Sequence, residues 1–223
     1  MLSIDIIVPI YNEKKCVEEL VKRIQKACPE GKITFIDNAS TDGTLEILDK
    51  MEAVSVIHHQ VNEGYGKSLI DGINETSGEK IVIIDADLEY PPEAIAEVNK
   101  ELDNHDAVFG SRFYDGSDID MSAFRSLGNR TINVIFNFLY SKNLTDLYTG
   151  IRGFRREALS GMDFDRHGFE FVLEISCKLA KKSFRFKEVA VIYNPRSTGK
   201  SKMKHIPEAL KFAFWILYYR VLG

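Results

Sequence analysis

The protein has 223 residues, a formal net charge of −4, 44% hydrophobic residues and 28% charged residues. This length suits one large α/β domain with a buried core, and we expect a single unit over residues 1–223. Because charges of both signs are mixed and the net charge is negative, no global basic field indicates a nucleic-acid partner. Any anion site must therefore be local.

Cysteine usage and the N-terminus predict a cytoplasmic protein. Cys16, Cys28 and Cys177 are scattered and lack the CxxC or histidine-rich spacing of a zinc site, so we expect free thiols in a reducing compartment. The opening MLSIDIIVPIYNE enters a strand at once, without the basic and apolar regions of a signal peptide.

The first half of the chain alternates short apolar runs with segments of helical periodicity. The runs are rich in valine and isoleucine and read IDIIVPI, KITFID, AVSVIHH, KIVIIDAD and HDAVFGS. Between them lie candidate helices at about 14–28, 41–52, 64–76 and 92–103. This alternation predicts a mainly parallel sheet with helices on both faces, in which ligands bind beyond the carboxyl ends of the strands.

The second half is less regular. It contains a partly apolar helix near 125–140, a TGIRGFRR stretch, a helix at about 169–181, a strand RFKEVAVIY, a basic loop and an apolar terminal helix. No internal repeat or low-complexity linker divides it from the first half.

Two aspartates follow the fourth apolar run, in DADLEYPPE. Residues i and i+2 of a strand point to the same side, so Asp85 and Asp87 could aim both carboxylates at one point if strand geometry continues through them. Such a pair needs a cation, and oxygen ligands suit Mg²⁺ or Mn²⁺, which complete their shells with substrate phosphates. The alternative is a helix N-terminus, with Asp87 or Glu89 as the cap and prolines in the first turn.

A second acidic segment, FIDNASTDGT, also ends a strand and opens a helix. Asp37 could accept hydrogen bonds from a base or a sugar, whereas Asp42 or Ser40 is better explained as a helix cap.

The segment NEGYGKS has some features of a phosphate loop. Val61, however, stands where the pattern G-x-x-x-x-G-K-S requires glycine, which argues against a P-loop ATPase. We interpret Gly64 and Gly66 as a flexible entry to a helix, although Lys67 could still reach a phosphate.

With these segments in place, the chain resembles the family 2 glycosyltransferases of the GT-A fold. More narrowly, it is similar to the polyprenol-phosphate sugar transferases, the dolichol-phosphate mannose synthase group. The matching segments, in family order, are IVPIYNE, IDNASTDGT, DADLEYPPE, GSR at 110–112, DLYTGIRGFRRE at 146–157, GFEFVLE at 168–174 and RSTGKSKM at 196–203. Two positions depart from the family pattern: Asn38 replaces a common second aspartate, and Glu89 stands where the mannose synthases often carry glutamine.

The resemblance implies a donor, a metal and a division of the chain. The donor would be a nucleotide-diphosphate sugar such as GDP-mannose or a UDP-hexose, bound by 1–111, while 112–204 would bind the acceptor. Mg²⁺ or Mn²⁺ would bridge the diphosphate to Asp85, Asp87 and Glu89. The implied nucleotide-binding residues are Pro9, Tyr11, Glu13, Asp37, Lys67, Asp85 and Ala86.

The implied acceptor is a polyprenyl or dolichyl phosphate. Its second pKa lies near 6, so it is nucleophilic at neutral pH without a general base and needs cations to position it. The resemblance places the acceptor phosphate at Arg112, Arg125, Asn129 and Arg196, and we add Lys202 from the basic loop; the residues implied in catalysis are Asp87, Arg112, Arg125 and Arg196. Arg130, Arg152 and Lys200 add charge to this half, whereas Arg155, Arg156, Lys181 and Lys182 are interpreted as solvated surface charges.

The terminal segment IPEALKFAFWILYYRVLG favours a membrane surface. Its uncharged core, Phe212 to Tyr219, is far shorter than the roughly 20 residues that span a bilayer. Aromatic residues beside KSKMKH are typical of an interfacial helix over 205–223, and NVIFNFLY at 133–140 could lie in the same surface. The alternatives are a helix packed on the domain, a homodimer interface, or a continuation into membrane helices or a membrane-protein partner.

Three other functions stay open. A glycosyltransferase acting on a soluble or polysaccharide hydroxyl would need a carboxylate base, for which Asp146, Glu170 and Glu174 are candidates. A sugar-nucleotide pyrophosphorylase would need a glycine-rich basic loop after the first strand, where PIYNEKK stands instead. A silent nucleotide-binding module is disfavoured because both aspartates of DADLEYPPE are present.

Overall fold

The computed structural model describes residues 2–114, 123–195 and 205–222, except for the side chains of 123–127 and 205–210. The strands are β1 (Ile4–Ile10), β2 (Lys32–Asp37), β3 (Val54–His58), β4 (Lys80–Ile84), β5 (Ala107–Ser111), β6 (Ile151–Arg155) and β7 (Phe186–Ala190). The helices are α1 (Val17–Ala27), α2 (Thr44–Leu48), α3 (Tyr65–Glu75), α4 (Ala94–Glu101), α5 (Ala123–Tyr140), α6 (Arg156–Leu159), α7 (Phe171–Ala180) and α8 (His205–Val221).

One seven-stranded sheet organises the molecule, in the order β3-β2-β1-β4-β6-β5-β7. Its pairs are parallel except for those of β6, which runs antiparallel to both β4 and β5. The prediction of an α/β fold with a mainly parallel sheet is therefore confirmed. Strands from both predicted halves of the chain join this sheet, and the division at residue 111 stays a prediction.

The strand β6 corrects the sequence interpretation, which left TGIRGFRR without regular structure. The strand is hard to recognise from the sequence because glycine is depleted in strands and arginine is usually exposed. Arg152 and Gly153 are nevertheless both buried here. Gly153 is needed because α4 packs closely on it: an added Cβ would lie 2.5 Å from the Cγ1 atom of Val98. A charged residue and a glycine thus occupy the middle of the sheet.

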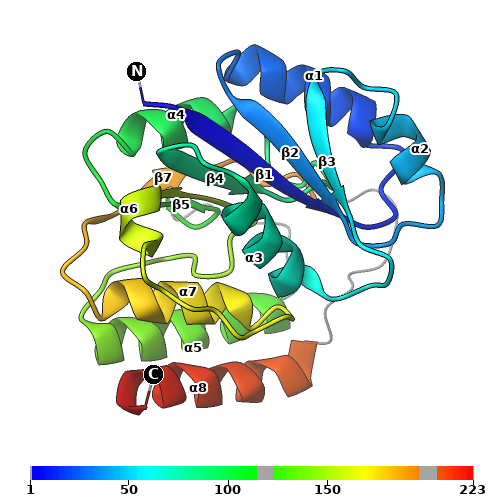
Figure 1. Cartoon of the computed structure of the whole chain (residues 1–223). Helices are drawn as coiled ribbons and strands as arrows, with labels where there is room; N and C mark the ends of the chain where they lie inside the picture. The colour runs from blue at the N-terminus through cyan, green and yellow to red at the C-terminus, as the bar shows by residue number, and fades with distance from the viewer. Residues whose placement is uncertain (1, 115–122, 196–204, 223) are drawn as a thin grey trace.

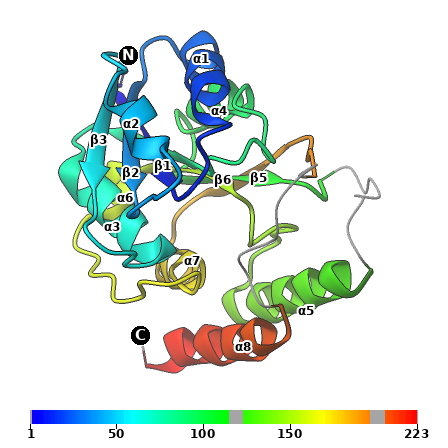
Figure 2. The same ribbon diagram turned by 90° about the vertical axis from the view of Figure 1, so that its right-hand side faces the viewer.

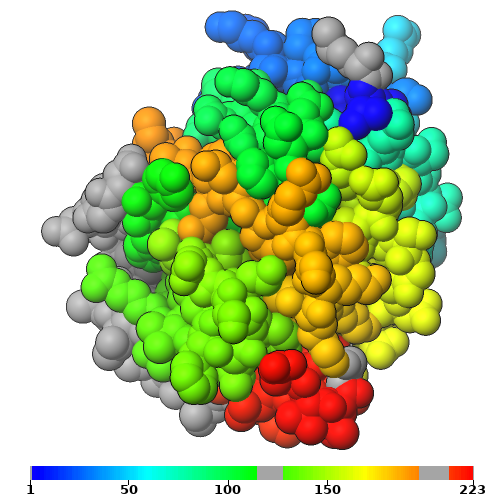
Figure 3. Space-filling view, turned by 90° about the vertical axis from the view of Figure 1, so that its left-hand side faces the viewer, coloured from blue at the N-terminus to red at the C-terminus, as the bar shows by residue number. Residues whose placement is uncertain are grey.

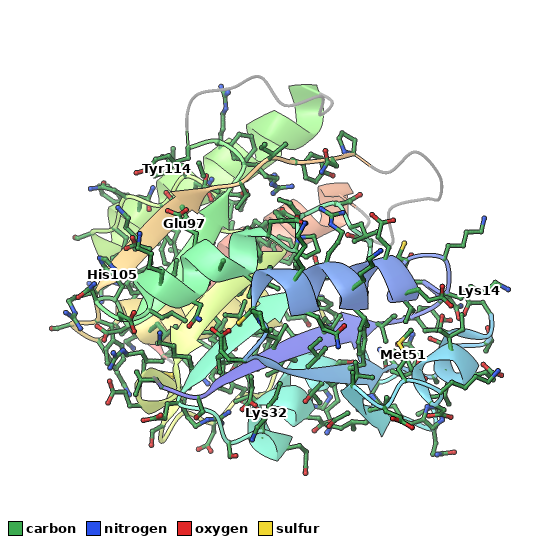
Figure 4. The ribbon with its side chains drawn as sticks, turned by 90° about the horizontal axis from the view of Figure 1, so that it is seen from above. Lys14, Lys32, Met51, Glu97, His105 and Tyr114 are labelled. Atoms are coloured by element: carbon green, nitrogen blue, oxygen red, sulfur yellow. The ribbon has the colours of Figure 1, made fainter. Side chains whose placement is uncertain are left out.

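Helices cover both faces of the sheet (Figures 1 and 2). On one face α1 and α4 lie over a core that includes Ile6, Phe35 and Val82; Figure 4 looks down on this layer, with Glu97 labelled on α4. On the other face α3, α5, α7 and α8 enclose a second core that includes Ile83, Phe109 and Phe136. The two-sided cover follows from strands that are apolar on both faces.

The last helix packs against the body of the molecule. Phe212, Ile216 and Tyr219 of α8 are buried, and the Tyr140 hydroxyl at the end of α5 donates to the Ile216 carbonyl at 3.2 Å. In the described part of the chain, no helix is both long and apolar enough to cross a membrane.

Candidate active site

The acidic segments predicted from the sequence meet at one edge of the sheet. Parallel pairing sets Ile10 beside Asp37 and Asp37 beside His58, and β4 ends at Ile84, directly before Asp85. Because the carboxyl ends of parallel strands share an edge, the loops that follow β1, β2 and β4 surround one site.

Two predicted nucleotide-binding loops are tied together there. The Asn12 amide donates to Ser40 Oγ at 2.9 Å, the Thr41 amide donates to Asn12 Oδ1 at 2.7 Å, and the Glu13 amide donates to Thr44 Oγ1 at 3.1 Å. Tyr11 and Glu13 are partly exposed on this double loop, whereas Pro9 is buried within β1.

Asp37 is fully buried at the end of β2 and already has protein partners. The Ser40 amide lies 3.3 and 3.2 Å from its two oxygens, and His58 Nδ1 lies 2.9 Å from Oδ2. Its carboxylate therefore stabilises the loop after β2, and its role toward a nucleotide stays a prediction. Gly43, rather than Asp42 or Ser40, stands at the N-cap of α2, although Asp42 accepts the Thr44 amide at 3.0 Å.

The strand geometry assumed for Asp85 and Asp87 does not continue through the pair. β4 stops at Ile84, and the chain turns through residues 85–88, with Leu88 at a φ of 60°. The charge of Asp87 nevertheless acts on Asp85: burial and then this charge raise the pKa of Asp85 to about 7. A turn, and not strand alternation, brings them together.

Two adjacent carboxylates are hard oxygen donors whose mutual repulsion a divalent cation would relieve, so this pair fits Mg²⁺ or Mn²⁺. Next to the larger effect of burial, the charge of Glu89 raises the pKa of Asp85 and also that of Tyr193. Within residues 2–114, 123–195 and 205–222, no three histidine, cysteine or acidic side chains gather as a metal cluster. Glu89 as a third ligand therefore stays a prediction. Ala86, between the aspartates, is buried.

The first turn of α3 is bonded to another segment of the chain and does not present its amides to a phosphate. The amides of Gly66 and Lys67 both donate to the His167 carbonyl, at 2.7 and 3.2 Å, and a Cβ on Gly66 would collide with the Arg166 carbonyl. Lys67 is paired with Asp71 at 2.5 Å. The expectation that this segment is no P-loop agrees with this geometry, and Lys67 as a nucleotide ligand remains a prediction.

Among the predicted acceptor residues, Arg112 occupies an aromatic niche. Its Nε and Nη2 atoms pair with the two oxygens of Asp146 at 2.7 and 2.9 Å, and its guanidinium lies 5.6 Å from the Tyr90 ring and 5.3 Å from the Tyr193 ring. Asn129 is half-buried on α5. Arg125 (side chain), Arg196 and Lys202 lie outside the described residues.

The three carboxylates considered as bases are engaged in the described structure. Asp146 is fully buried against Arg112, and Glu174, also fully buried, accepts the amides of Asp165 and Arg166 at 3.1 and 2.9 Å. Glu170 lies 3.5 Å from Lys211 Nζ. Asp146 and Glu174 therefore have evident structural roles.

Two residues near Asp85 were not assigned to this site from the sequence. The Tyr65 hydroxyl donates to Asp85 Oδ1 at 2.8 Å. Arg152 is fully buried, its charge lowers the pKa of Asp85, and its Nε and Nη1 atoms have no hydrogen-bond partner among the described residues. No sequence pattern signals either relationship, because both join distant segments.

The sequence pattern of Glycosyl transferase family 2 matches residues 5–162. The chain belongs to this family. The match extends from the second residue of β1 through α6 and includes the three acidic segments at the edge of the sheet. The predicted resemblance is thereby confirmed, and the protein is a glycosyltransferase.

Two relatives with named activities show which members of the family this chain is similar to. The polyprenol monophosphomannose synthase of Mycolicibacterium smegmatis is 29% identical to this glycosyltransferase, over 94% of this chain and 85% of the relative. The dolichol-phosphate mannosyltransferase of Pyrococcus furiosus is 30% identical over 91% of this chain, which spans 60% of that relative.

A solved structure confirms the GT-A fold. The mannosyltransferase PcManGT from Pyrobaculum calidifontis, in complex with GDP-Man and Mn²⁺, superposes with a TM-score of 0.62 at 17% identity, covering 99% of this chain and 70% of that one. At this identity the likeness concerns the fold alone.

Proposed function

We propose that this glycosyltransferase transfers a sugar from a nucleotide-diphosphate sugar, GDP-mannose or a UDP-hexose, to a polyprenyl phosphate at a membrane surface. Both named relatives carry polyprenol or dolichol phosphate chemistry in their names, and they align along most of this chain.

The donor would lie along the carboxyl edge of the sheet. Tyr11 and Glu13 on the joined loops after β1 and β2 would contact the nucleoside, Asp37 would hold the second loop beside it, and the diphosphate would approach Asp85 and Asp87. Mg²⁺ or Mn²⁺ held by the two aspartates would act as a Lewis acid toward the departing diphosphate. Because carboxylates repel phosphates, the pair favours a diphosphate only together with a cation.

The engagement of the candidate bases is the observation that carries the choice of acceptor. A hydroxyl acceptor needs a carboxylate to take its proton, and Asp146 and Glu174 are each fully buried and bonded within the protein. A phosphate acceptor has no such requirement, since it is largely ionised at neutral pH.

With a phosphate acceptor, the protein needs only to position the lipid phosphate next to the sugar and to supply positive charge. An oxygen of the lipid phosphate attacks the anomeric carbon, the bond from that carbon to the diphosphate oxygen breaks, and the nucleoside diphosphate leaves with the bonding electrons. Arg112, Arg125 and Arg196, with Asn129 and Lys202, are the proposed phosphate ligands. Asp146 binds Nε and Nη2 of Arg112, so Arg112 would donate to the lipid phosphate through Nη1.

The membrane surface would be formed by α5 and α8, which lie side by side on the outside of the molecule (Figures 1 and 3). Both helices expose large apolar side chains: Phe138 on α5 is 85% exposed and Phe214 on α8 is 58% exposed, accompanied by Val134 and Leu217. Burying these side chains in the interface of a bilayer is favourable. The protein would thus bind peripherally, beside its lipid acceptor.

A donor screen tests this function. Purified protein is incubated with polyprenyl phosphate in detergent, with GDP-mannose, UDP-glucose or other nucleotide sugars, and with Mn²⁺ or excess chelator. We expect a lipid-linked sugar and free nucleoside diphosphate with one donor, in the presence of metal only. Failure of every nucleotide sugar to yield lipid-linked product would contradict the proposal.

A further inference from the structure

Tyr65 stands at a fixed position beside the acidic pair. It is the first residue of α3, and the preceding Gly64 has a φ of 99°, a conformation that favours glycine and sets the direction of the helix entry. The Tyr65 ring stacks on Phe169, with centroids 5.1 Å apart and an interplanar angle of 22°. The loop that carries Phe169 is itself bonded to α3 through the Gly66 amide and the His167 carbonyl. The ring therefore has little freedom.

The position of this ring determines where its hydroxyl points. The hydroxyl donates to Asp85 Oδ1 at 2.8 Å, and Asp85 is anchored from the other side because its amide donates to the Gly150 carbonyl at 3.0 Å. Oδ2 lies so close to Gly150 that a Cβ there would be 2.5 Å away. Oδ1 is thus hydrogen-bonded, whereas Oδ2 only packs beside Gly150.

No other donor in the described part of the chain holds this carboxylate. Arg152 is near enough for its charge to act on Asp85, but no ion pair within 4.0 Å joins them, and its Nη2 atom donates to the Thr149 carbonyl instead. Asp87, whose Oδ1 accepts the Glu89 amide at 3.0 Å, adds only repulsion. The orientation of Asp85 therefore depends on the Tyr65 hydroxyl.

We propose that Tyr65 is a positioning residue, whose hydroxyl holds the Asp85 carboxylate in the orientation that binds a divalent cation together with a nucleoside diphosphate. This inference rests on the proposed function. Hydrogen bonds to metal-ligating carboxylates orient the ligand, and their loss commonly weakens metal affinity by about 10- to 100-fold.

The substitution Tyr65→Phe removes the hydroxyl and keeps the ring that stacks on Phe169. Tyr140→Phe is the matched control, because it also removes one tyrosine hydroxyl from the second core, where that group donates to the Ile216 carbonyl between α5 and α8. Mn²⁺ affinity is measured from the paramagnetic resonance signal of free Mn²⁺, with saturating GDP in one series and UDP in another. Nucleotide affinity in chelator is measured by calorimetry.

We expect Tyr65→Phe to weaken Mn²⁺ binding by about tenfold or more, while its nucleotide affinity in chelator stays within about twofold of wild type and Tyr140→Phe binds Mn²⁺ normally. Excess Mn²⁺ should restore turnover of Tyr65→Phe. Mn²⁺ binding within about twofold of wild type, or an equal loss of nucleotide affinity in chelator, would overturn the inference and leave the proposed function standing. If the wild-type protein binds no Mn²⁺ with either nucleotide, the inference about Tyr65 and the proposed metal-dependent function are both contradicted.

Discussion

Arg112, directly after β5, and Asp146, in the loop before β6, form a buried two-point ion pair between residues 34 positions apart. The pair is extended by Glu188 of β7, which accepts the amides of Thr145 and Asp146 at 2.8 and 3.0 Å. This network fixes the loop that leads into β6 and holds one proposed acceptor ligand in place.

Asp146→Asn should destabilise the protein. The substitution leaves the Arg112 guanidinium buried without a counter-charge, which typically costs about 3–5 kcal/mol. Chemical denaturation measures the loss. Glu157→Gln, in an exposed pair with Arg155, is the control and should cost less than about 1 kcal/mol. A variant that unfolds at the wild-type denaturant concentration would contradict the structural role of Asp146.

Glu174→Gln should also lower the free energy of unfolding. Its carboxylate accepts two loop amides and Lys178 Nζ at 2.8 Å, and an amide group would place a donor against these donors. Charge-assisted hydrogen bonds contribute about 1.5–3 kcal/mol each, so we expect a loss of that order in the free energy of unfolding. Turnover per folded molecule should persist. Normal stability with abolished turnover would instead support a catalytic carboxylate.

Asp87→Ala should abolish metal-dependent turnover without unfolding the protein. Asp87 is partly exposed and its neighbour Asp85 cannot hold a divalent ion alone, so we expect a fall in kcat of about 10²-fold or more and lost Mn²⁺ binding. Asp103→Ala, at an exposed carboxylate beyond α4, is the control and should behave as wild type in turnover. Full turnover of the wild-type protein in excess chelator would refute the metal requirement.

Phe138→Ser combined with Phe214→Ser should weaken binding to vesicles. Each exposed ring that enters an interface contributes up to about 1.5–3 kcal/mol, so the double variant should bind at least about tenfold more weakly at an unchanged unfolding temperature. Co-sedimentation with anionic phospholipid vesicles measures this. Val61→Ser, an exposed valine outside both helices, is the control. Equal retention of the double variant and wild type on vesicles would exclude this surface.

The sequence allowed much of the fold to be predicted, because its strands are continuous apolar runs and its first helices have clear apolar periodicity. It also placed Asp37 and Asp85 at one edge, since parallel strands end together. β6 was missed because Arg152 and Gly153 oppose the strand pattern.

Side-chain partnerships could not be predicted in the same way. Tyr65 with Asp85 and Arg112 with Asp146 are brought together by tertiary packing, for which local periodicity carries no signal. The turn through Leu88 likewise depends on a positive φ at a residue type that rarely adopts one. The strand geometry expected for Asp85 and Asp87 was therefore wrong, and their shared role toward a metal ion stays a prediction.

The identity of the nucleophile is the central claim, and a comparison of two acceptors with the same tail tests it most directly. Wild-type protein, Mn²⁺ and a labelled nucleotide sugar that the donor screen selects are incubated with either polyprenyl phosphate or the corresponding polyprenol. We predict labelled lipid from the phosphate and none from the alcohol, since the candidate bases Asp146 and Glu174 are fully buried and bonded within the protein. Labelling of the polyprenol, or of a soluble sugar, at a rate equal to or above that of the polyprenyl phosphate would contradict the account.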